Sequence, residues 1–112
     1  MAKPANRPHS RYAREALAHL GNLIREGRQA KHLTAKELAE RAGISRALLA
    51  RIEAGEPGCG IGAVLEVAAI VGIPLFDADP GTMTVLHEHS TQRKALLPKL
   101  VRTTLRGVKD DF

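Results

Sequence analysis

The 112-residue sequence has few aromatic residues and only one cysteine. Aromatic residues make up 3% of the chain, so any core must consist of aliphatic side chains, which suits packed helices. The same scarcity argues against a protein that holds single-stranded nucleic acid by stacking bases on aromatic rings. The lone Cys59 excludes an internal disulfide, and we interpret it as an incidental loop residue.

Long apolar runs are also missing from the sequence. No stretch of about 18 apolar residues occurs, so we expect no membrane-spanning helix. The N-terminus is basic and polar and lacks the apolar segment of a signal peptide. No acid pair, nucleophilic triad or glycine-rich phosphate loop stands out. These absences predict a cytoplasmic protein that is not an enzyme and needs no cofactor.

Charge is distributed unevenly along the chain. Residues 1–57 contain 11 basic and 6 acidic residues, whereas residues 58–92 contain 4 acidic residues and no lysine or arginine. Residues 93–112 are basic again, with 6 lysines and arginines against 2 aspartates. A concentration of positive charge in the first half is what a surface facing DNA phosphates requires.

Residues 33–55 have the pattern of two short helices joined by a tight turn. Thr34 and Glu37 have the spacing of a capping box at the start of the first helix. Gly43 supplies a residue that ends a helix in the left-handed conformation, and Ser45 can cap the second helix. The inward face of the second helix is predicted to be Leu48, Leu49 and Ile52. This pattern predicts a helix-turn-helix, whose second helix can lie in a DNA major groove.

The segment from about residue 20 to 75 resembles the helix-turn-helix of the Xre family, the group containing lambda-type repressors and Cro. The motifs that carry the resemblance are Leu20-Gly21-x-x-Ile24-Arg25-x-x-Arg28, Leu33-Thr34-x-x-Glu37-Leu38-Ala39, Gly43-Ile44-Ser45 and Ile52-Glu53-x-Gly55. The resemblance implies an all-α, lambda-repressor-like bundle of about five helices that binds a near-palindromic operator in double-stranded DNA as a homodimer. It also implies that Arg28 and Glu53 form an internal salt bridge behind the recognition helix.

The recognition helix places the side chains of its first turns against base edges. Arg46 is the best candidate, because arginine can donate two hydrogen bonds to guanine. Helix N-termini attract phosphate oxygens, so Ser45 and Thr34 are expected at the DNA backbone. The predicted DNA-binding set is Thr34, Lys36, Ser45, Arg46, Ala47, Ala50 and Arg51, with Arg28, Glu53 and Gly43 in structural roles. Ala35 departs from the family pattern, which often has glutamine there to hold the DNA backbone.

Residues 61–71 predict a helix that is apolar nearly all round, with Glu66 as its only charge. Such a helix is either buried on every side or shared with a partner. In so small a domain we expect sharing, and we predict that Val67, Ile70 and Ile73 help to form a dimer.

Residues 82–89 leave two interpretations open. The run Thr82 to His87 is rich in residues that favour strands, and a helix over 82–97 fits almost equally well. In a strand, His87 and His89 would share a face, but no further cysteine or histidine cluster is near in sequence, so we predict no metal site.

The C-terminal third suggests a biological role. Leu97-Pro98-Lys99-x-Val101-Arg102 and the ending Val108-Lys109-Asp110-Asp111-Phe112 resemble the tail of HipB-like antitoxins, Xre proteins that pair with HipA-like Ser/Thr kinase toxins. The resemblance implies an autoregulating antitoxin whose tail binds the toxin. The alternatives are a stand-alone Xre repressor of phage or restriction-modification type, and a protein-interaction module without DNA binding.

The predicted organisation has four parts. These are a flexible basic arm over 1–11, the DNA-binding domain over 12–76, a turn followed by a strand or helix and available for dimerisation over 77–92, and a basic tail over 93–112.

Overall fold

The computed structural model describes the backbone of residues 8–111 and the side chains of residues 8–97. These residues divide between two compact units, Met1–Pro74 and Leu75–Phe112. Most of the arm predicted at residues 1–11 lies outside the described residues, as do Phe112 and the side chains of the tail beyond residue 97. Ser10 precedes the first helix and caps it, its side-chain oxygen accepting from the Ala13 amide.

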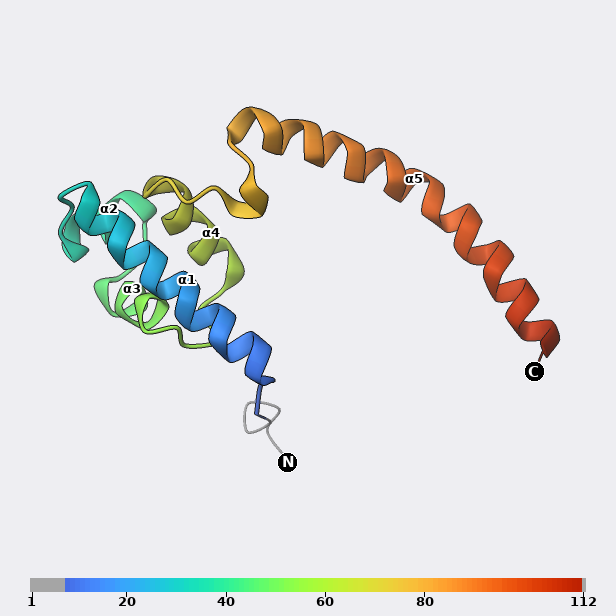
Figure 1. Cartoon of the computed structure of the whole chain (residues 1–112), viewed down its shortest axis with the longest axis horizontal. Coiled ribbons are helices and arrows are strands. Elements are labelled where there is room, and N and C mark those ends of the chain that lie inside the picture. The colour runs from blue at the N-terminus through green and yellow to red at the C-terminus, as the bar shows by residue number, and fades with distance from the viewer. Residues whose placement is uncertain (1–7, 112) are drawn as a thin grey trace. The chain divides into compact units, whose positions relative to one another are not determined.

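The first unit is built from four helices that surround one small aliphatic core (Figure 1). They are α1 (Arg11–Ala30), α2 (Ala35–Ala42), α3 (Arg46–Glu53) and α4 (Ile61–Ile70). Helix α3 packs against both α1 and α2, and α4 packs against α2. Each helix contributes one large side chain that is completely buried, namely Ile24, Leu38, Leu49 and Val67. The core thus fixes α3 from behind and leaves its other side toward solvent.

The second unit contains a short 3-10 turn, η2 (Leu75–Asp77), and the long helix α5 (Pro80–Asp111). The described backbone therefore consists of five α-helices and one 3-10 turn without strands, which confirms the predicted all-α bundle of about five helices. None of the described helices combines the length and apolar character needed to cross a membrane.

Residues 82–89 lie inside α5, so the strand interpretation is wrong. Asp79 and Pro80 start the helix: the Asp79 carboxylate accepts from the Thr82 amide at 2.7 Å, and proline is favoured in a first helical turn. The Thr84 hydroxyl donates to the Pro80 carbonyl one turn back at 3.1 Å, which accommodates a strand-favouring residue within the helix. The hydrogen bond from the Thr82 amide also holds the pKa of Asp79 below its usual value.

Gly21 allows α1 and α3 to approach each other closely. It is buried, and a Cβ atom built on it would lie 2.6 Å from the Glu53 carbonyl oxygen and 2.8 Å from that of Ile52. Because those are backbone atoms, they cannot move aside without shifting the end of α3.

We therefore expect Gly21→Ala to lower the free energy of unfolding by about 1–3 kcal/mol, the usual cost of overpacking a core. Urea denaturation measures the change. Gly62→Ala is the matched control, since Gly62 is also helical and has no neighbouring atom within 4 Å of the added Cβ. That variant should be neutral or gain up to about 1 kcal/mol through helix propensity. Equal stability of the two variants would contradict the close approach.

Candidate nucleic-acid interface

The turn between α2 and α3 is formed by local hydrogen bonds. Gly43 ends α2 in the left-handed conformation, with φ 70°, which an L side chain rarely adopts. The Ile44 amide then donates to the Ala39 carbonyl at 3.0 Å. Ser45 caps α3, its Oγ accepting from the Leu48 amide at 3.0 Å. The turn therefore sets the direction in which the second helix leaves the first.

Helix α3 has one buried side and one exposed side. Leu49 and Ile52 are buried and Leu48 is half-buried, so these three residues face the core as expected. Every residue predicted to contact DNA is exposed: Thr34, Lys36, Ser45, Arg46, Ala47, Ala50 and Arg51. The exposed side of α3 thus carries two small alanines between two arginines that lie five residues apart.

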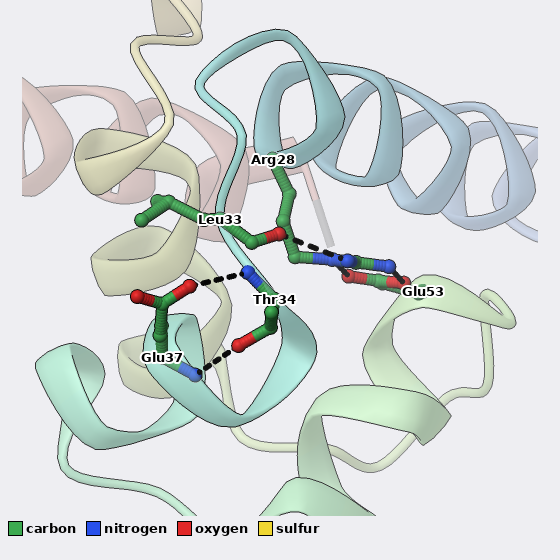
Figure 2. Close-up of polar contacts among 5 residues, drawn as sticks. All are labelled: Arg28, Leu33, Thr34, Glu37 and Glu53. Carbon is green, nitrogen blue, oxygen red and sulfur yellow. Dashed lines mark hydrogen bonds and ion pairs between the residues drawn. The ribbon is translucent and has the colours of Figure 1, made fainter.

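Arg28 joins three parts of the bundle behind this surface. Its Nε and Nη2 donate to the two carboxylate oxygens of Glu53 at 2.8 and 3.0 Å (Figure 2). Its Nη1 donates to the Leu33 carbonyl at 3.2 Å. The side chains of Arg28 and Glu53 are only 14% and 11% exposed. The pair therefore ties the end of α3 to α1 and to the turn that leads into α2.

The start of α2 has the reciprocal capping box that the sequence predicts. The Thr34 Oγ1 accepts from the Glu37 amide at 3.0 Å, and the Glu37 carboxylate accepts from the Thr34 amide at 2.8 Å (Figure 2). The bond from the Thr34 amide holds the pKa of Glu37 below its usual value. The cap fixes Thr34 and Lys36 at the N-terminus of α2, which is the favourable end for a phosphate oxygen.

Glu56 is a residue that the sequence reasoning missed. Its carboxylate accepts from the Arg51 Nε at 3.3 Å, although it lies in the loop beyond α3. Gly55, with φ 76°, turns the chain so that Glu56 returns beside Arg51. A glycine two residues past the end of a helix, followed by a charge opposite to one in the last helical turn, is the signal that could have found this pair.

The structure corrects part of the predicted dimer surface. Val67 is completely buried in the core of its own chain, so it is not available to a partner and the prediction for it is wrong. Ile70 and Ile73 are half-buried. The large apolar side chains that α4 does expose are Ile61, at 78%, and Leu65, at 42%.

His87 and His89 lie on α5, where residues two apart point to nearly opposite sides of the helix. The shared face that a strand would have given them is therefore lost. Within the described side chains, no group of three histidine, cysteine or acidic residues is placed to hold a metal ion.

Comparison with known proteins agrees with this geometry. A family model described as a helix-turn-helix domain matches residues 19–78, which include α2, the turn and α3. No curated protein matches the chain. The match covers more than half of the sequence and indicates a DNA-binding regulator. The chain therefore belongs to the helix-turn-helix domain family.

Proposed function

We propose that the chain is a transcriptional repressor of the Xre type that binds an operator in double-stranded DNA as a homodimer. The observation that carries the proposal is the exposed side of α3. Ala47 and Ala50 are small enough for the helix to approach base edges closely, and Ala47 can touch a thymine methyl group. Arg46 and Arg51 on either side can each donate two hydrogen bonds to a guanine.

Contacts to the DNA backbone would orient α3 on the duplex. Thr34 and Ser45 cap the N-termini of α2 and α3, so amide groups at both helix starts are available to phosphate oxygens. Lys36 is exposed in the first turn of α2 and adds a positive charge there. Such contacts fix the position of the protein but carry no sequence information, which leaves discrimination to the arginines of α3.

A homodimer would place two α3 helices in successive major grooves, with half-sites roughly 34 Å apart. The exposed apolar residues Ile61 and Leu65 of α4 support association of two chains. The half-buried Ile70, at the end of α4, and Ile73, just after it, are further candidates. Two identical subunits require a near-palindromic operator.

The proposal is tested by selecting binding sites from a library of random double-stranded DNA with the full chain at physiological salt. We expect enrichment of one near-palindromic sequence with half-sites about 10 base pairs apart. Binding without any enriched sequence would contradict a sequence-specific repressor. A single half-site, bound by a monomer in sedimentation analysis, would contradict the homodimer.

A finer proposal is that this cytoplasmic repressor is the autoregulating antitoxin of a type II toxin–antitoxin pair with a HipA-like Ser/Thr kinase. It is supported by the resemblance of the tail to HipB-like antitoxins. The tail carries its own net positive charge and follows a segment that is acidic. The alternative is a stand-alone Xre-type repressor of phage or restriction-modification type, which a neighbouring kinase gene would argue against.

Deleting residues 93–112 is expected to remove kinase binding and leave operator affinity within about threefold, because the four helices of the first unit hold the predicted DNA-binding residues. Pull-down of the kinase encoded beside the gene, together with gel-shift titration, measures both properties. Undiminished capture of the kinase would contradict the role of the tail.

A further inference from the structure

Arg51 and Glu56 form an ion pair at the edge of the candidate DNA surface. The Arg51 Nε lies 3.3 Å from a Glu56 carboxylate oxygen, and the two side chains are 47% and 53% exposed. A pair with this much exposure adds little to stability, because water and salt screen it and because ordering both side chains costs entropy. Its position beside the recognition helix suggests a different role.

Glu56 is held in place by its backbone. Its amide donates to the Arg51 carbonyl at 3.0 Å, and its carbonyl accepts from the buried Cys59 thiol at 3.2 Å. Gly55 before it lies directly against α1, since an added Cβ would come within 2.7 Å of the Ala18 Cα. The loop that presents Glu56 is therefore anchored to α1, to α3 and to its own following residues.

The contact engages one specific edge of the Arg51 guanidinium. The Nε donor is directed to Glu56, and neither terminal nitrogen of Arg51 has a hydrogen-bond partner among the described side chains. Those two nitrogens form the fork that can donate in parallel to guanine O6 and N7. Fixing the guanidinium at Nε would orient that fork before DNA arrives and reduce the entropy lost on binding.

The Glu56 carboxylate has a second effect, through its charge. A negative group beside the groove repels the phosphates of every DNA, so it lowers the affinity for operator and unrelated DNA alike. At the right site, bonds from both terminal nitrogens to the base offset this repulsion. A repulsion common to all sequences leaves the ratio of affinities unchanged, so the preference for guanine comes from the orientation of Arg51.

We propose that Glu56 is a positioning residue that makes Arg51 selective for a guanine-containing base pair in the major groove. This inference rests on the proposed DNA-binding function and adds a residue outside the helix-turn-helix itself. The effect of Glu56 on discrimination is exerted through Arg51, so removing Arg51 must abolish that effect.

The experiment uses the full chain and four variants, Glu56→Gln, Arg51→Ala, the double variant and Glu26→Gln. Glu26 is exposed on α1 and forms no ion pair among the described side chains, so its neutralisation controls for net charge. Affinities are measured for the selected operator, for each single-base-pair change in it, and for unrelated duplex DNA, while circular dichroism monitors folding.

Glu56→Gln is expected to reduce discrimination at one guanine position by about five- to tenfold and to strengthen binding to unrelated DNA. Glu26→Gln should leave discrimination unchanged, and Glu56→Gln should add no loss in the Arg51→Ala background. The positioning role would be overturned if Glu56→Gln left discrimination unchanged. It would also be overturned if Glu56→Gln reduced discrimination as much in the Arg51→Ala variant as in the wild-type chain. A wild-type chain that shows no sequence preference would instead overturn the proposed function, so the two failures are distinct.

Discussion

Glu53→Leu is expected to lower the free energy of unfolding by about 3 kcal/mol, the lower end of the range for breaking a buried ion pair. The Arg28 side chain is 14% exposed in the native protein, and the variant leaves its guanidinium without the two carboxylate oxygens that now accept from it. Because the Arg28 side chain keeps some access to water, we expect a loss at the lower end of that range. Urea denaturation followed by circular dichroism gives the value.

The double variant Arg28→Met/Glu53→Leu separates the charge effect from the loss of packing. Replacing both charges with apolar side chains removes the uncompensated guanidinium, so we expect it to recover most of the lost stability. The double variant also leaves the Leu33 carbonyl without the Arg28 donor, which costs about 1 kcal/mol. If the single and double variants unfolded at the same urea concentration, the pair would not be coupled.

A change in pH is not expected to reproduce this loss of stability by deprotonating Arg28. The hydrogen bond to Glu53 holds the pKa of Arg28 above its usual value. A raised pKa means that the stabilisation is complete below the unfolded-state pKa and disappears only as pH rises through the folded one. Both values lie beyond the alkaline range in which proteins are normally studied, so mutation is the appropriate test.

Local features of the fold were predictable because each depends on residues a few positions apart. The caps at Thr34 and Ser45 and the turn at Gly43 use hydrogen bonds that span three to five residues, and sequence spacing encodes these directly. The pairing of Arg28 with Glu53 spans 25 residues, and it entered only through the resemblance to a family.

Features that depend on how helices meet were not predictable in the same way. A helix that is apolar all round does not reveal which side packs inward, and α4 turns Val67 into the core while exposing Ile61 and Leu65. Strand-favouring residues at 82–87 suggested a strand, but the cap at Asp79 and the proline after it decide for a helix. Glu56 was missed because its position depends on the path of a loop anchored against α1.

Replacing both Arg46 and Arg51 with alanine is expected to have the largest effect on operator binding. Each bidentate arginine–guanine pair contributes about 1–3 kcal/mol of discrimination. The two residues are separated by about 7.5 Å along the helix axis, so their contributions should be nearly additive. We therefore expect the double variant to lose about 2–6 kcal/mol of preference for the operator over unrelated DNA. Competition gel-shift assays measure this preference.

A variant with the same loss of charge elsewhere makes this test specific. Arg14 and Arg25 are exposed on α1, and Arg14→Ala/Arg25→Ala also removes two positive charges. Loss of charge alone weakens binding to all DNA and reduces its salt dependence, but it leaves the preference for the operator intact. The α3 variant should lose the preference even where salt is lowered until the total affinities match. If both variants kept the operator preference, α3 would not be the element that reads the bases, and the exposed arginines would serve only as phosphate contacts.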